Sequence, residues 1–179
     1  PRVVLAINEP NLKGQAFIPP EQAAKLFKEV LAIAEPYHLE VVGPQMALGS
    51  APNASIKVQS DPITHKPTTY GWMGSFLDAF FFYVGKANVP AFSVHSYKDM
   101  GELRWAVSSM HKTYGKPIWV TEFANWNASG DDAERAYMMQ AVDFLESTPY
   151  VQGYSWFKER VNGNEKLSIL GNSGQLTAL

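Results

Sequence analysis

Five short apolar runs alternate along the chain with longer segments in which apolar residues recur at a helical period. The runs show little polar alternation, which is typical of strands buried on both faces of a parallel sheet. They lie at residues 3–8, 40–45, 91–97, 117–122 and 151–157. The segments between them predict amphipathic helices at 20–35, 69–84, 101–114 and 131–146. Repeated strand–helix units predict an α/β fold in which helices cover a parallel sheet.

Three other stretches add to this pattern. Segment 46–68 carries three prolines after the second strand, and loops of this length are usually functional or mobile. Trp72, Phe76 and Phe80 fall on one helical stripe, which predicts core packing rather than a sugar platform. The tail at 162–179 is rich in Gly and Asn, which favours a short hairpin.

Two of the predicted strands end on a carboxylate. The run VVLAI passes directly into Asn8 and Glu9, and the fourth strand ends on Glu122. The carboxyl ends of parallel strands form the functional face of such folds. A carboxylate pair there suits hydrolysis of a glycosidic bond, in which one group is a protonated acid and the other an ionised nucleophile or base. Either glutamate taken alone would more ordinarily be a solvated residue at a strand end.

Other side chains at the strand ends favour the pair over two unrelated glutamates. Asn8 is suited to hydrogen-bond a sugar hydroxyl, Tyr97 to hold a nucleophile in place, and Trp156 to offer a flat floor to a pyranose. Trp126 follows Glu122 in a loop, where a sugar subsite and simple loop packing are equally good interpretations.

Composition narrows the possible partners. The 179 residues suffice for one domain with a sizeable core, and a net charge of −2 provides no basic field for nucleic acid. No apolar run approaches the roughly 20 residues of a membrane span. The chain has no cysteine, so neither disulfides nor thiolate chemistry is available. Two Asn-x-Ser triplets, at 53–55 and 127–129, are compatible with secretion but are weak evidence, and the location and oligomeric state stay open.

Several of these motifs together resemble glycoside hydrolase family 128. The resemblance is carried by VVLAINEPN, SVHSY, GKPIWVTEFANW, VQGYSWF and the closing SILGNSGQLTAL. It runs through essentially the whole chain, so that residues 1–179 resemble a catalytic domain. It implies a (β/α)8 TIM-barrel fold of clan A and a retaining enzyme that acts mainly on β-1,3-glucans.

The resemblance also implies roles for individual residues. It makes Glu9 the general acid/base and Glu122 the nucleophile. It places other side chains around the substrate, with Asn8 against the 2-hydroxyl, His95 and Tyr97 around the nucleophile, and Trp156 beneath the central sugar. Asn11 stands where the family often has Asp, a difference that we expect to affect local capping rather than the chemistry.

Strand counting predicts that the domain is partial. In clan A the acid/base lies on the fourth strand and the nucleophile on the seventh. Here the strand of Glu122 is the third after that of Glu9, and one more follows. The five strands then correspond to strands four to eight, and a full barrel has about 250 residues. We therefore expect a catalytic domain that lacks its first three β/α units.

Other chemistries find little support in the sequence. The four histidines show no metal-binding spacing, no Gly-rich phosphate loop follows a strand, and no Gly-x-Ser-x-Gly elbow is present. We expect neither a metal nor a cofactor. Three functions remain: a retaining endo-β-1,3-glucanase, a non-catalytic glycan-binding protein, and an inactive fragment of such an enzyme.

Overall fold

The computed structural model describes residues 2–158, 168–170 and 173–176. The chain divides into two compact units, Pro1–Ser93 and Val94–Leu179. Strand β5 begins in the first unit and ends in the second. No helix in the described part of the chain is both long and apolar enough to cross a bilayer.

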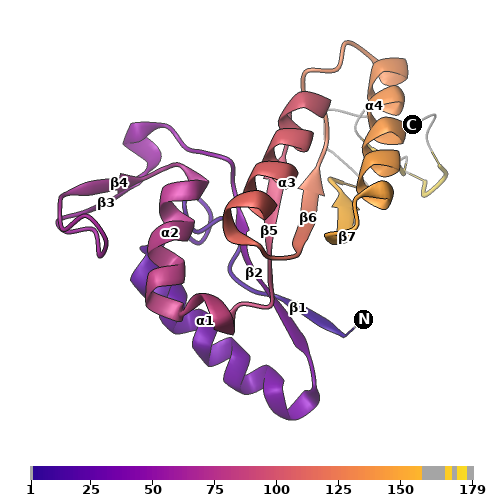
Figure 1. Ribbon diagram of the computed structural model, residues 1–179. Coiled ribbons are helices and arrows are strands. Elements are labelled where there is room, and N and C mark those ends of the chain that lie inside the picture. The colour runs from indigo at the N-terminus through magenta and orange to yellow at the C-terminus, as the bar shows by residue number, and fades with distance from the viewer. Residues whose placement is uncertain (1, 159–167, 171–172, 177–179) are drawn as a thin grey trace. The chain divides into compact units, whose positions relative to one another are not determined.

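Five strands form the main sheet, in the order β1-β2-β5-β6-β7 (Figure 1). They are β1 (Val3–Leu5), β2 (Glu40–Met46), β5 (Ala91–Ser96), β6 (Ile118–Phe123) and β7 (Val151–Trp156). Strand β1 pairs in parallel with β2, and β6 pairs in parallel with β7. All five coincide with the predicted apolar runs to within three residues at each end, and they confirm the α/β fold class.

In the first unit, two helices pack against each other (Figure 1). Helix α1 (Pro20–Ala34) begins with a proline in its first turn, and α2 (Met73–Val84) ends at Gly85, whose φ is 81°. Phe27 of α1 meets Phe80 of α2 edge to face, with ring centroids 5.5 Å apart, and both side chains are fully buried. Their contact forms the centre of this unit's core. A short 3-10 helix, η1 (Glu35–Tyr37), leads from α1 towards β2.

The segment between β2 and α2 is more ordered than the sequence predicts. It contains the 3-10 helix η2 (Pro52–Ala54) and an antiparallel pair, β3 (Ile56–Val58) with β4 (Thr68–Tyr70). Because Thr69 lies in β4, the helix that was expected to start there begins four residues later. Phe76 is buried as predicted, but Trp72 lies just before the helix and is 44% exposed, so its assignment to the core is wrong.

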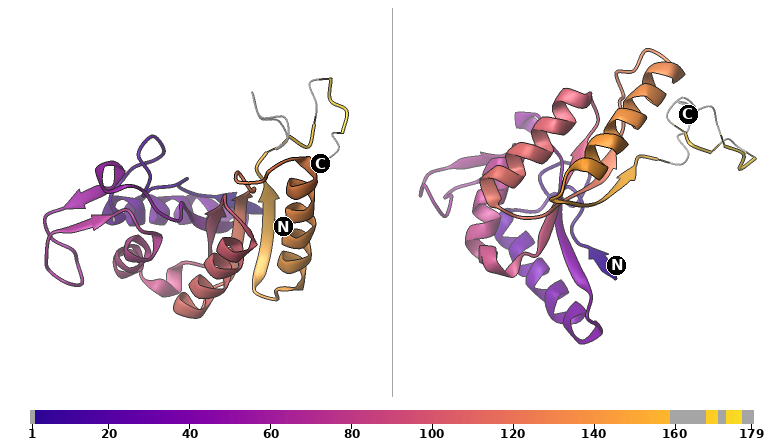
Figure 2. Two further views of the ribbon diagram at one scale, coloured as in Figure 1. Left: turned by 90° about the horizontal axis from the view of Figure 1, so that it is seen from above. Right: turned by 45° about the vertical axis from the view of Figure 1, so that its right-hand side comes forward.

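The second unit is built from two further helices beside their strands (Figure 2). Helix α3 (Met100–Tyr114) is capped by Asp99, which accepts a hydrogen bond from the Glu102 backbone, and α4 (Asp131–Ser147) precedes β7. Buried apolar side chains from these elements make its core: Leu103, Val107, Ile118, Val120, Phe123, Tyr137, Ala141 and Leu145.

The predicted hairpin in the tail is described only in part. Leu170 and Leu176 form an isolated antiparallel bridge, which agrees with a hairpin. The rest of that prediction, at 162–167, 171–172 and 177–179, lies outside the described residues.

Candidate active site

Glu122 lies near the carboxyl end of β6, and two side chains converge on its carboxylate. The Tyr97 hydroxyl donates a hydrogen bond to Glu122 Oε2, and His95 Nδ1 lies 3.5 Å from the same oxygen. The Glu122 side chain is 26% exposed. One carboxylate oxygen is therefore held from two sides, in a position that solvent or a ligand can still reach.

His95 is fixed inside the unit. Its side chain is 1% exposed, and its Nε2 lies 3.0 Å from the Thr121 hydroxyl. With Nδ1 directed at Glu122 and Nε2 at Thr121, each ring nitrogen has a polar neighbour, which fixes the ring orientation. His95 is the fifth residue of the fully buried strand β5, so its position follows from the strand-end motif SVHSY.

An aromatic layer adjoins this carboxylate. The Trp126 ring stacks on Tyr97 with centroids 4.3 Å apart and an interplanar angle of 26°. The Trp126 backbone N–H also donates to the Tyr97 carbonyl, while Phe157 meets Tyr97 edge to face. Trp126 is 52% exposed. The two interpretations of Trp126 were a sugar subsite and loop packing. One face of the ring packs on Tyr97, and the side chain still has a large accessible surface.

Two acidic residues behind this layer were missed in the sequence. Glu102 Oε1 accepts hydrogen bonds from the Ser96 hydroxyl and from the Tyr97 backbone N–H. Glu134, fully buried, accepts one from the backbone of Asn125, next to Trp126. Both lie in first helical turns, where acidic residues are common because they complement the helix dipole, so the sequence gives no sign of this second role.

Trp156, the last residue of β7, packs into the second unit. Its ring lies 5.3 Å from Phe123 and 6.2 Å from Tyr137, and the residue is half-buried. Burial raises the pKa of the Tyr137 hydroxyl, and the nearby charges of Glu134 and Glu102 add to the effect. Tyr137 is therefore a neutral hydroxyl at any physiological pH.

In the first unit, Asn8 and Glu9 lie just beyond the carboxyl end of β1. Asn8 forms a parallel bridge with Gln45, and the Glu9 backbone N–H donates to the Gln45 carbonyl at 2.8 Å. Asn8 is exposed and its amide donates to Gln15, whereas Glu9 is 5% exposed. Ile7 and Glu9 have φ values of 65° and 40°, a left-handed conformation that costs about 1–3 kcal/mol per residue and is found preferentially at functional sites.

Asn11 has a different function from the one expected. It is fully buried, and its amide nitrogen donates to the carbonyls of Ala47 and Gly71, at 2.9 and 3.1 Å. The backbone carbonyl of Asn11 accepts a hydrogen bond from the Ser50 hydroxyl. The prediction of a local cap is wrong, because these bonds join segments 36 and 60 residues apart in the sequence. Asn11 ties the Glu9 loop to the segment that follows β2.

A comparison with protein families finds a match along all 179 residues. The sequence model of the glycosyl hydrolase catalytic core family matches residues 1–179. The chain belongs to this family. The predicted relation to glycoside hydrolases is thereby confirmed.

Solved structures relate this glycosyl hydrolase chain to family 128. The chain is 30% identical to an endo-β-1,3-glucanase of subgroup II from Pseudomonas viridiflava, with a TM-score of 0.80. This match includes 99% of the present chain and 66% of the Pseudomonas chain. For a subgroup II endo-β-1,3-glucanase from Sorangium cellulosum, the identity is 24% and the TM-score 0.77, with the same coverage. These similarities confirm the TIM-barrel type of α/β fold, and the chain spans 66% of the length of each of these two relatives.

A curated relative shows the same partial coverage. The alkali-sensitive linkage protein 1 of Schizosaccharomyces pombe is 33% identical over 117 residues, which are 59% of this chain and 21% of that protein. Other family 128 structures contain laminaritriose, laminarihexaose or glucose, and one from Cryptococcus neoformans is named an oligosaccharide-binding protein. At 20–21% identity these structures show a shared fold only.

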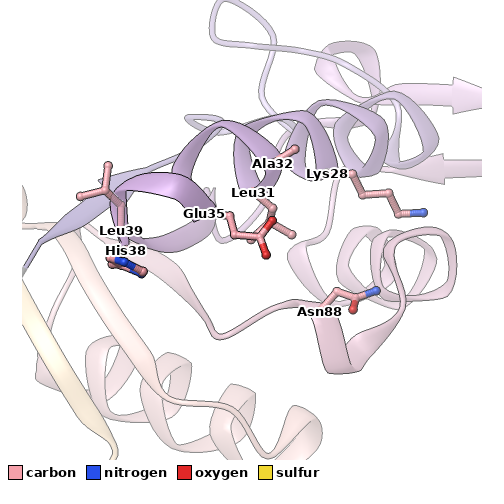
Figure 3. A pocket seen from close by; sticks show the side chains of 7 residues that line it. All are labelled: Lys28, Leu31, Ala32, Glu35, His38, Leu39 and Asn88. Carbon is pink, nitrogen blue, oxygen red and sulfur yellow. The ribbon is translucent and has the colours of Figure 1, made fainter.

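The chain also has an open pocket of about 570 Å³ in the first unit, and none of its lining residues is a predicted site residue (Figure 3). It lies where α1 ends and η3 (Lys86–Asn88) begins, and it is lined by Lys28, Leu31, Ala32, Glu35, His38, Leu39 and Asn88. Helix α1 leads into the amino end of β2, and this face of barrel folds generally serves stability rather than catalysis. The pocket is therefore not the candidate active site.

Proposed function

We propose that this glycosyl hydrolase is a retaining enzyme that cleaves β-glucan, most specifically an endo-β-1,3-glucanase. The observation that carries the proposal is the environment of Glu122, whose carboxylate accepts from Tyr97 and faces His95 beside an exposed aromatic ring. A nucleophilic carboxylate needs such support, because hydrogen bonds to its charged form keep it ionised and correctly oriented.

In the proposed reaction, Glu122 attacks the anomeric carbon while Glu9 protonates the departing glycosidic oxygen. The sugar is then joined to Glu122 through an ester bond, and the first product leaves. Glu9, now a carboxylate, removes a proton from water, and this water displaces Glu122 from the anomeric carbon. Two inversions restore the β configuration. The mechanism requires the two carboxyl groups to lie about 5–5.5 Å apart.

The remaining predicted residues would bind the sugar. Asn8 is exposed next to Glu9, so its amide is available for the 2-hydroxyl, whose hydrogen bonds strengthen in the transition state. Trp126 and Trp156 would present apolar ring surface to the pyranose faces. The relation to β-1,3-glucanases supports a β-1,3-glucan as the substrate.

Hydrolysis of laminarin tests the proposal. The 179-residue chain would be assayed for new reducing ends. Glu9→Gln and Glu122→Gln should each lower kcat by at least about a thousandfold, as expected when a group that forms or breaks bonds is removed. Glu29→Gln, on the exposed face of α1, is the matched control and should keep full activity. Undiminished turnover in either active-site variant would refute the assignment.

A second candidate function is glycan binding without turnover. The exposed aromatic side chain of Trp126 favours it, because a protein that only binds a glycan needs such a stacking surface and no catalytic pair. Laminarihexaose that binds with micromolar affinity and remains intact after prolonged incubation with the chain would establish this function. An absence of both binding and hydrolysis would indicate an inactive fragment of such an enzyme.

A further inference from the structure

We propose that Trp72 is a sugar-stacking platform, a binding subsite for one glucose unit of a β-glucan that lies away from the bond being cleaved. The proposal rests on the carbohydrate function proposed above and extends it to a residue outside the predicted site. Three observations in the first unit carry it: the exposure of the indole, the glycines that adjoin it, and the hydrogen bonds that fix its backbone.

The indole is unusually accessible for a residue between a strand and a buried helix. Trp72 is 44% exposed, whereas the flanking residues Tyr70 and Met73 are 1% and 0% exposed. Single exposed aromatic residues are common on protein surfaces and carry no function by themselves. The argument therefore depends on how the ring is held.

Two glycines lie against the ring. A Cβ added to Gly74 would lie 2.6 Å from Trp72 Nε1, and one added to Gly49 would lie 3.8 Å from Trp72 Cε3. The five-membered ring thus approaches the backbone more closely than any larger residue at 74 would allow. Gly74 lets the indole rest close to the chain on one side, whereas a Cβ at Gly49 would make only an ordinary van der Waals contact. The residue nevertheless stays 44% exposed.

The backbone on both sides of Trp72 is tied down. The Gly71 carbonyl accepts from the Asn11 amide at 3.1 Å and from the Ser50 backbone N–H at 3.0 Å. The Met73 N–H donates to the Leu48 carbonyl at 3.2 Å. The platform is therefore preorganised, which reduces the entropy lost when a ligand binds.

The position of Trp72 agrees with a role in binding substrate. It lies on the loop that leads from the carboxyl end of β2 into α2, and in barrel folds such loops build the active-site face. Asn11, which holds Gly71, is two residues beyond Glu9. The same buried amide therefore connects the platform to the loop of the proposed acid/base. A flat apolar ring held here suits the C–H face of a pyranose, with water leaving both surfaces on contact.

Calorimetric titration with laminarihexaose tests the proposal, in a Glu122→Gln background so that the ligand is not consumed. Trp72→Ala should weaken binding about tenfold or more, as is typical for a tryptophan anchor, and Trp72→Phe should fall between it and the parent. Trp105→Ala is the matched control, because Trp105 is 46% exposed but lies on the body of α3. It should bind as the parent does.

Gly74→Ala gives a second, independent test, because its added methyl group displaces the indole without removing it. Laminarihexaose binding should weaken in Gly74→Ala but fall no further in the Trp72→Ala, Gly74→Ala double variant than in Trp72→Ala alone. Equal affinities of Trp72→Ala and Trp105→Ala for laminarihexaose would overturn the platform. The proposed function would still stand if the parent hydrolysed laminarin. Weakened binding in Trp72→Ala, from a parent without hydrolysis, would support the platform and refute the enzyme. Failure of every form to bind laminarihexaose would overturn the platform.

Discussion

At the scale of single residues, Tyr97 connects the chemistry to the aromatic surface. Its hydroxyl donates to Glu122, its ring stacks on Trp126, and its backbone N–H is held by Glu102. The strand-end pattern predicted that Tyr97 lies beside Glu122, and the resemblance to family 128 implied that His95 lies there too. Neither could predict the contribution of Glu102, because an acidic residue in a first helical turn already has a sufficient local explanation.

Tyr97→Phe should lower kcat for laminarin about ten- to a hundredfold, because a hydrogen bond to a charged group contributes about 1.5–3 kcal/mol. The free energy of unfolding should change by less than about 1 kcal/mol, since Glu122 is partly exposed and water can replace the hydroxyl. Steady-state kinetics and urea denaturation measure the two quantities. A loss of activity matched by a comparable loss of stability would show that Tyr97 is merely structural.

Asn11→Asp should destabilise the protein by about 2–4 kcal/mol. An ionised Asp cannot donate to the Ala47 and Gly71 carbonyls, and it would place a buried charge beside two carbonyl oxygens. Urea denaturation at pH 7 measures the effect. Asn127→Asp, in an exposed loop, is the control and should be nearly neutral; equal stability of both variants would contradict the buried clamp.

At the scale of elements, the sequence predicted the four long helices and five parallel strands but missed the β3–β4 hairpin. The strands of the hairpin have only three residues each, and the prolines around them favoured a loop. A hydrogen bond between side chains nine residues apart ties β4 to the loop that precedes it: the Tyr70 hydroxyl donates to Asp61 Oδ2 at 2.5 Å. Hydrophobic periodicity does not reveal such a polar pair. Trp72 was assigned to the core because its spacing from Phe76 and Phe80 fits a helix. Since β4 ends at Tyr70 and α2 begins at Met73, Trp72 lies outside the helix.

The hairpin should make stability depend on pH in a defined direction. Burial alone would raise the pKa of Asp61, but hydrogen bonds from Tyr70, Thr64 and Ile63 outweigh burial and hold it below its usual value. A lowered folded-state pKa stabilises the protein above the unfolded-state pKa, and this stabilisation is lost as the pH falls through the folded-state value.

Tyr70→Phe should therefore reduce the free energy of unfolding by about 1–3 kcal/mol at pH 7, and the difference from the parent should shrink as the solution is acidified below about pH 4. Chemical denaturation over a series of pH values would measure it. Tyr83→Phe serves as the control with little expected change, because Tyr83 is a half-buried tyrosine of the same unit. A Tyr70→Phe difference that stays constant down to pH 2 would contradict the contribution of Asp61.

At the scale of the whole molecule, the chain covers 66% of the length of the two similar family 128 endo-β-1,3-glucanases, and a partial barrel would leave apolar faces uncovered. Large apolar side chains are indeed exposed on β1 and around the end of α1: Leu5 is 52%, Ile33 68% and Tyr37 64% exposed. The outer edge of β1 has no strand partner among the described residues. Such faces favour association.

The 179-residue chain should consequently self-associate, and Ile33→Glu with Tyr37→Ser should shift it towards monomer in sedimentation velocity experiments. Met139→Ser is the control, because Met139 is 63% exposed on α4, a helix of the second unit. The unfolding free energy should stay within about 0.5 kcal/mol, since neither side chain is buried. Unchanged sedimentation of the double variant would show that these residues do not mediate association.

The most direct test of the central assignment is the configuration of the glycosyl azide formed by two variants from an activated aryl β-laminaribioside. In Glu122→Ala, azide should occupy the space of the missing carboxylate and attack the anomeric carbon directly, giving the α-azide by one inversion. In Glu9→Ala, Glu122 still forms the covalent intermediate, and azide should then displace it to give the β-azide by two inversions. Proton NMR of the products distinguishes the two anomers. An α-azide from Glu9→Ala and a β-azide from Glu122→Ala would contradict the account.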